Sequence, residues 1–100
     1  MNKRRKGSNP DSALYSAILR LDTREECYQF FTDLCADTEL GAMEQRFEVA
    51  RMLLKGMSYN EIMEQVGASS ATISRVSRCL STGTGAYEHI FSQLADEEEE

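Results

Sequence analysis

The stretch from Met57 to Leu80 constrains this chain most, because it contains the start and stop signals of two short helices joined by a tight turn. Ser58 and Glu61 have the spacing of a capping box, which predicts that a helix begins at Ser58. Gly67 follows Val66 where the chain must turn, and glycine adopts a positive φ at little steric cost. The sequence therefore predicts a first helix that ends near Val66 and a turn at Gly67.

The second helix of this unit is predicted over residues 70–81. Ser69 and Ser70 can each provide its N-cap, because a serine hydroxyl accepts a hydrogen bond from an amide of the first turn. One stripe at helical spacing is apolar and is expected to be core; it consists of Ile73, Val76 and Leu80. Together the two helices predict a helix-turn-helix at residues 57–81.

The opposite face of the second helix has small, hydroxyl-bearing or cationic side chains and no acid: Ser70, Ala71, Ser74, Arg75 and Arg78. Small residues let a helix enter the major groove of DNA, hydroxyls reach base edges or phosphates, and arginine binds guanine or phosphate. This face predicts double-stranded DNA as the partner. The alternative is a helix pair used only for packing or for binding another protein.

The same residues resemble the helix-turn-helix of the Trp repressor family over residues 56–80, G-M-S-Y-N-E-I-M-E-Q-V-G-A-S-S-A-T-I-S-R-V-S-R-C-L. The resemblance extends upstream through residues 46–56, R-F-E-V-A-R-M-L-L-K-G, and covers roughly residues 40–80. The whole chain is similar to the Trp-repressor-like proteins of the YerC/YecD type. This resemblance implies a transcriptional regulator, a repressor by analogy, that forms an intertwined homodimer.

The resemblance also implies which residues contact DNA. Ala71 and Ser74 match positions close to the bases, and Arg75 matches an arginine that reaches phosphate. Asn60 and Met63 stand where the Trp repressor has basic side chains, so some contacts are expected to be lost or changed. The DNA-binding set predicted from the pattern and the resemblance is Asn60, Ser69, Ser70, Ala71, Thr72, Ser74, Arg75 and Arg78.

A candidate effector pocket follows from the resemblance and comprises Arg46, Thr72, Arg75, Val76 and Cys79. Arg46, Thr72 and Arg75 match residues that hold tryptophan in the Trp repressor. Val76 replaces a glycine there, and Cys79 replaces a serine that helps to hold the ammonium group. Valine adds bulk and a thiol is a poorer hydrogen-bond partner than a hydroxyl, so an effector other than tryptophan is expected. The alternative for Arg46 is a solvated residue or an ion pair between subunits.

Caps and apolar spacing predict four further helices, giving an all-α chain of about six short helices. Their predicted ranges are Pro10 to Leu21, Thr23 to Ala36, Thr38 to Gly56 and Ala86 to Ala95. The residues of the Thr38 to Gly56 helix that are expected to face inward are Leu40, Met43, Phe47, Ala50, Leu53 and Leu54. The apolar stripes of the first, second and last helices lie outside the helix-turn-helix. A homodimer would cover them and present two recognition helices to a palindrome, although a compact monomer stays open.

Charge divides the chain into a flexible basic arm at residues 1–8, a single helical domain at 9–95 and an acidic tail at 96–100. The net charge is −6, but the tail contributes five negative charges and residues 3–6 contribute four positive ones. Because the distribution of charge matters more than its total, DNA is not excluded. The arm is either a phosphate-contacting or a solubilising segment, and the tail either solubilises or shields the basic surface.

No enzyme, cofactor or metal site is predicted. The chain has an odd number of cysteines, which are widely spaced and have no clustered histidines: Cys27, Cys35 and Cys79. This pattern argues against a disulfide framework and against a zinc site. A thiol redox switch is the alternative. His89 has no nucleophile at a fixed spacing to activate. The basic start lacks the apolar stretch of a secretory signal and no apolar run could span a bilayer, so a cytoplasmic protein without a membrane partner is expected.

Overall fold

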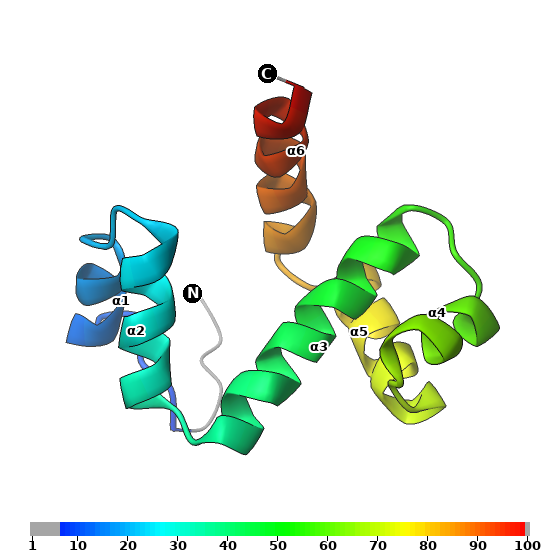
Figure 1. The fold of residues 1–100 in the computed structure, drawn as a ribbon, viewed down its shortest axis with the longest axis horizontal. Coiled ribbons are helices and arrows are strands. Elements are labelled where there is room, and N and C mark those ends of the chain that lie inside the picture. Colours follow the sequence, from blue (N-terminus) through cyan, green and yellow to red (C-terminus); the bar gives the residue numbers. More distant parts are fainter. Residues whose placement is uncertain (1–6, 100) are drawn as a thin grey trace. The chain divides into compact units, whose positions relative to one another are not determined.

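The structure is a computed structural model that describes residues 7–99, with only the backbone described for Glu98 and Glu99. Most of the predicted basic arm lies outside the described residues. Residues 7–99 form six α-helices and no strand, so the prediction of an all-α chain is confirmed (Figure 1). The helices are α1 (Ala13–Ile18), α2 (Arg24–Leu34), α3 (Asp37–Leu54), α4 (Tyr59–Val66), α5 (Ser70–Thr82) and α6 (Ala86–Glu99).

Packing divides the chain into two compact units, residues 1–37 and residues 38–100. The first unit contains α1 and α2. The second contains nearly all of α3 together with α4, α5 and α6. The single helical domain expected over residues 9–95 stays a prediction.

The first helix begins later than its capping signals predict. The side chain of Asn9 accepts a hydrogen bond from the amide of Asp11 at 3.0 Å, and the carbonyl of Asn9 accepts one from the amide of Ser12 at 3.1 Å. Asn9 thus closes a turn before the helix. Ser12 is the N-cap, with its hydroxyl 3.2 Å from the amide of Leu14. The predicted range 10–21 is therefore too long, because a local turn takes the place of the first helical turn.

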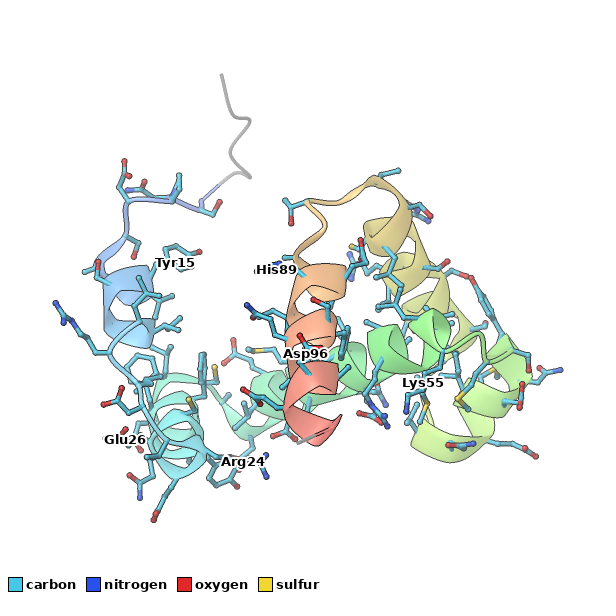
Figure 2. All side chains as sticks on the ribbon, turned by 90° about the horizontal axis from the view of Figure 1, so that it is seen from above. Tyr15, Arg24, Glu26, Lys55, His89 and Asp96 are labelled. Carbon is cyan, nitrogen blue, oxygen red and sulfur yellow. The ribbon has the colours of Figure 1, made fainter. Side chains whose placement is uncertain are left out.

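The capping box predicted at the start of α2 is confirmed. The hydroxyl of Thr23 accepts from the amide of Glu26 at 3.1 Å, and the carboxylate of Glu26 accepts from the amides of Asp22 at 2.9 Å and Thr23 at 3.1 Å. These bonds, the one from Asp22 most of all, lower the pKa of Glu26. Figure 2 labels the Glu26 side chain on α2. The helix ends at Leu34, earlier than predicted, because Cys35 has extended backbone with φ −109° and ψ 149°.

Neither α1 nor α2 buries a side chain. Leu19, which caps the end of α1, is 83% exposed, and Tyr28 and Leu34 of α2 are 62% and 52% exposed. Phe30 and Phe31 pack edge to face with their ring centroids 5.4 Å apart, yet both remain only half-buried. The first unit therefore presents apolar surface and has no buried core among its described residues.

The core of the second unit lies where α3 meets α4 and α5 (Figure 1). Its buried residues come from these helices and from the turn between the last two: Val49, Ala50, Met52, Ile62, Ala68, Ile73 and Val76. Fully burying a side chain of the size of valine or isoleucine stabilises a fold by roughly 1.5–3 kcal/mol. The apolar stripes of α4 and α5 thus hold the helix pair on α3.

The predicted inward face of α3 is only partly right. Met43 and Leu54, which were expected to face inward, are 38% and 44% exposed. Val49 and Met52, which were not in the predicted set, are 0% and 6% exposed. The reason is that α3 contacts the helix-turn-helix on one side and an aromatic cluster around Phe47 on another, so its apolar residues do not form one stripe.

The helix α6 packs against α3 through three aromatic rings. The ring centroid of Phe91 lies 4.7 Å from that of Phe47 and 6.3 Å from that of Tyr87. Tyr87 in turn lies 6.3 Å from Phe47. Part of the apolar face of α6, which the sequence placed outside the DNA-binding unit, is therefore covered within the same unit.

The last helix also extends into the predicted acidic tail. It continues to Glu99, whereas the prediction ended at Ala95. Figure 2 shows Asp96 on the helical ribbon of α6. Carboxylates oppose the helix dipole at a C-terminus, but glutamate is a good helix former, and its propensity outweighs this modest repulsion. Residues 96–99 therefore belong to a helix.

Candidate nucleic-acid interface

The helix-turn-helix is shaped by two caps and one glycine. Ser58 and Glu61 form the predicted capping box: the Ser58 hydroxyl accepts from the Glu61 amide at 3.2 Å, and the carboxylate accepts from the Ser58 amide at 2.9 Å. The bond from the Ser58 amide is the largest cause of a lowered pKa at Glu61. Gly67 ends α4 in the left-handed conformation, with φ 70° and ψ 15°. The predicted turn is confirmed, and local interactions are sufficient to explain it.

Ser69 is the N-cap of α5. Its hydroxyl accepts from the amide of Thr72 at 3.1 Å and also lies 3.1 Å from the Thr72 hydroxyl. Ser70 is the first residue of the helix, and its side chain is exposed. The sequence left open which serine caps the helix, and the structure assigns the cap to Ser69.

Two faces of α5 differ in burial and in chemistry. Ile73 and Val76 are 0% and 1% exposed, which confirms that they belong to the core. At 3.6 residues per turn, the five outer side chains fall within an arc of about 140° on another side of the helix. All five are exposed: Ser70, Ala71, Ser74, Arg75 and Arg78. The helix thus presents the face that the sequence singled out for DNA.

The outer face of α5 carries positive charge without a nearby acid on the same helix. There is no Asp or Glu in α5, and neither Arg75 nor Arg78 forms an ion pair with another residue in the described range 7–99. Arg51 of α3, in contrast, pairs with Glu48 and lowers the pKa of that carboxyl. Guanidinium groups are suited to phosphate recognition, so Arg75 and Arg78 can serve that purpose.

The α4 helix adds a smaller polar contribution. Asn60 and Met63 are exposed, and Met63 retains 39% of its accessible surface. The same helix exposes the carboxylates of Glu61 and Glu64. An amide beside two acids attracts phosphate less than the α5 face does, so α4 is the weaker half of the candidate interface.

The candidate effector residues occupy different environments. Thr72, Val76 and Cys79 follow one another at helical spacing along one flank of α5. Thr72 is half-buried and Cys79 is exposed, whereas the side chain of Val76 is 1% exposed and packs in the core. Arg46 is half-buried on α3 and Arg75 is exposed on α5. Val76 therefore occupies space in the interior and presents almost no surface to a ligand.

Gln45 of α3 is a polar residue that the sequence analysis did not single out. Its Nε2 donates a hydrogen bond to the carbonyl of Val66 at 3.4 Å. Val66 is the last residue of α4, and both partners are half-buried. The two residues are 21 positions apart, so no local pattern could have indicated this contact.

Other kinds of site find less support in the described residues. No cluster of three or more Cys, His, Asp and Glu side chains between residues 7 and 99 is arranged to hold a metal ion. Cys27, Cys35 and Cys79 form no disulfide. None of the helices in this range is both long enough and apolar enough to cross a membrane.

Comparison with known proteins identifies relatives of this arrangement. Residues 12–95 match the family described as Trp repressor protein. YerC, an uncharacterized protein of Bacillus subtilis (strain 168), is 49% identical over 87 residues, which cover 87% of this chain and 84% of YerC. The family resemblance inferred from the helix-turn-helix is therefore confirmed over most of the chain.

Two crystal structures are similar in fold and in sequence. One is of a Staphylococcus aureus protein provisionally described as a Trp repressor, with a TM-score of 0.80, 49% identity and coverage of 82% of each chain. The other is of a TrpR-like protein from Eubacterium eligens ATCC 27750, with a TM-score of 0.80, 46% identity and coverage of 82% of this chain and 84% of that one. These similarities confirm the predicted Trp-repressor-like fold.

Proposed function

Because this chain belongs to the Trp repressor family, we propose that it is a sequence-specific DNA-binding transcriptional regulator, most simply a repressor. Its partner is double-stranded DNA in the cytoplasm, and α5 is the helix that enters the major groove. Proteins of this family are regulators and not enzymes, so no catalytic step is proposed.

The observation that carries this proposal is the exposed, acid-free outer face of α5. Ala71 and Ser74 are small enough to approach base edges, and the Ser74 hydroxyl can donate to or accept from a base. Arg75 and Arg78 reach phosphates on either side of the groove and fix the register of the helix. Sequence readout is thus assigned to the small residues and most of the affinity to the arginines.

The remaining members of the predicted set have supporting roles. Ser70 is exposed at the start of α5 and joins the base-reading face. Ser69 and Thr72 bond to each other, so they act mainly by holding the N-terminus of α5 in place. Asn60 contributes an uncharged contact to the DNA backbone from α4. The net charge of −6 makes the proposed binding modest in affinity and sensitive to salt.

A homodimer is part of the proposal because α1 and α2, the helices of the first unit, bury none of their side chains. This unit leaves several large apolar side chains exposed, with Leu19 at 83%, Tyr28 at 62% and Leu34 at 52%, and extended apolar surface is typical of protein interfaces. A second copy of the chain would cover these groups. It would also place two copies of α5 at half-sites about 34–36 Å apart on the DNA.

Control by a small effector is proposed at the flank of α5, near Thr72, Arg75 and Cys79, with Arg46 from α3. Tryptophan is not the proposed effector. The support is that Val76, which the resemblance places beside the ligand, has its side chain packed in the core at 1% exposure. The effector, if the protein uses one, is therefore expected to have a shape different from that of an indole.

The test is selection of random duplex DNA by the full chain at low and moderate salt, with the solution mass measured on the same sample. The proposal predicts enrichment of a two-fold symmetric site by a dimer, and no change in that site's affinity when tryptophan is added. If no sequence is enriched and replacing Arg75 leaves residual binding unchanged, the helix pair serves protein interaction instead. The selection is repeated in parallel with other amino acids added. Enrichment that appears only with one of them would show that the protein binds DNA in its effector-bound state alone.

A further inference from the structure

We infer that Gln45 is a positioning residue for DNA readout, because its hydrogen bond to Val66 holds the end of α4, and with it the direction of α5, against α3. The inference rests on the proposed function and concerns how the same helix is aimed. Gln45 touches no predicted DNA-binding residue through this bond, so it acts through the turn that follows Val66.

The side chain of Gln45 leaves α3 on the face that packs against α4 and α5. Gln45 lies one helical turn before Val49, so both side chains leave the same face of α3, and Val49 is fully buried in the core shared with α4 and α5. The Nε2 of Gln45 reaches the carbonyl of Val66 at 3.4 Å. Val66 is the last residue of α4, so its carbonyl has no donor within that helix and can accept from Gln45.

This bond differs from the other side-chain hydrogen bonds of the helix-turn-helix. Within residues 57–82, the remaining bonds of this kind join residues three or four positions apart. They shape each helix locally but do not connect the pair to α3. The core contacts do connect them, but apolar burial is not directional. The Gln45 bond therefore adds a directional restraint immediately before Gly67.

The consequence concerns specificity more than affinity. Contacts to base edges need an alignment of a fraction of an ångström, whereas long arginine side chains can follow displaced phosphates. A net hydrogen bond contributes about 1 kcal/mol, which corresponds to about a fivefold change in an equilibrium constant. Losing the restraint should therefore reduce discrimination between sites by about fivefold while leaving sequence-independent binding nearly unchanged.

The experiment uses the full chain with Gln45→Met, which keeps length but removes the donor, and Gln45→Glu, which keeps shape but places an acceptor against the carbonyl. Gln93→Met is the matched control, because Gln93 is exposed on α6. Binding to the selected site and to a scrambled duplex is compared at a temperature where circular dichroism shows every variant folded. Amide hydrogen exchange at residues 66–69 is followed without DNA.

The expected result is that both Gln45 variants lose discrimination by about fivefold, bind the scrambled duplex within about twofold of wild type and exchange faster at residues 66–69. Unchanged discrimination in both variants overturns the inference, as does an equal loss on both duplexes. If the wild-type chain selects no sequence, the proposed function fails, and hydrogen exchange then tests the structural part of the inference alone. An unchanged turn in the Gln45 variants overturns it. A loosened turn, with the Gln93 variant unchanged, supports Gln45 as the residue that restrains the end of α4 and the direction of α5.

Discussion

The Ser69 hydroxyl accepts a hydrogen bond from the Thr72 amide at 3.1 Å, and the hydroxyls of the same two residues lie 3.1 Å apart. This pair starts the helix that carries the proposed DNA-reading face. Ser69 therefore contributes to α5 before any DNA is present, whereas Ser70 beside it is exposed on that face. Two adjacent serines of the same predicted set thus have separable roles.

Replacing Ser69 with Ala is expected to reduce the free energy of unfolding by about 1 kcal/mol, because the Thr72 amide loses its cap. Ser70→Ala is the matched control and should change the free energy of unfolding by less than about 0.5 kcal/mol, as expected for an exposed position. Urea unfolding at fixed protein concentration measures both values. Equal stability of the two variants would contradict the assignment of Ser69 as the cap.

Replacing Gly67 with Ala is expected to cost about 1–2 kcal/mol, because alanine is strained at the observed φ of 70°. A Cβ at this position would meet no atom within 4 Å, so the cost comes from the backbone alone. Gly41→Ala is a control of opposite sign: Gly41 lies within α3, and alanine should stabilise that helix by about 0.5–1 kcal/mol. Thermal unfolding of the two variants distinguishes a conformational requirement from a general effect of added methyl groups.

Replacing Glu61 with Gln should flatten the dependence of stability on acid pH. The pKa of Glu61 is lowered in the folded chain, chiefly by the Ser58 amide, so its charged form stabilises the fold above the unfolded-state pKa. That contribution is lost as the pH falls through the folded-state pKa. The glutamine retains an acceptor for the same amide but does not titrate. Urea midpoints from pH 6 to pH 3 should converge as the solution becomes more acidic, and parallel curves would argue against a role for this carboxylate.

Replacing Arg75 with Ala is expected to weaken binding to every DNA sequence and to reduce the salt slope of log K by about 1, because one phosphate contact is lost. Lys55→Ala is the charge-matched control, since Lys55 follows α3 and is exposed outside the predicted DNA-binding set (Figure 2). A salt series on the selected duplex measures both variants. The same slope for Arg75→Ala and wild type would remove Arg75 from the phosphate-contacting set.

Replacing Ser74 with Ala should alter sequence preference more than overall affinity, because a base contact contributes about 1–3 kcal/mol of discrimination. Ser92→Ala serves as the comparison, since Ser92 is exposed on α6 and lies outside the predicted DNA-binding set. Repeating the selection with each variant should change the preferred base at one position of each half-site only for Ser74→Ala. An unaltered preference would assign base readout to other residues of the face.

The elements that the sequence predicted well are those built by short-range interactions. The capping boxes at Thr23 and Ser58, the turn at Gly67 and the buried pair Ile73 and Val76 are all confirmed. In the caps and the turn, the interacting groups lie within a few residues of one another. In the buried pair, the apolar residues share one face of the helix. Errors arose where two local patterns competed, as at Asn9, whose side chain closes a turn before the first helix begins.

The candidate site shows the same division. The composition of the outer α5 face could be read from helical spacing, and its side chains are exposed as expected. Its contact with DNA stays a prediction. The Gln45 to Val66 bond could not be predicted, because a lone glutamine on a helix gives no signal of a partner 21 residues away.

The sequence by itself determined the number and kind of helices, the tight turn and the chemistry of the outer face of α5, because caps, glycine conformation and helical periodicity act over a few residues. Only the tertiary structure decided that α3 buries Val49 and Met52, that Phe47 packs with Phe91 of α6, and that Gln45 reaches α4. Such contacts depend on which surfaces meet when distant segments pack. Because α3 packs on two sides, its apolar residues do not form one stripe at helical spacing, and its contacts cannot be read from the sequence.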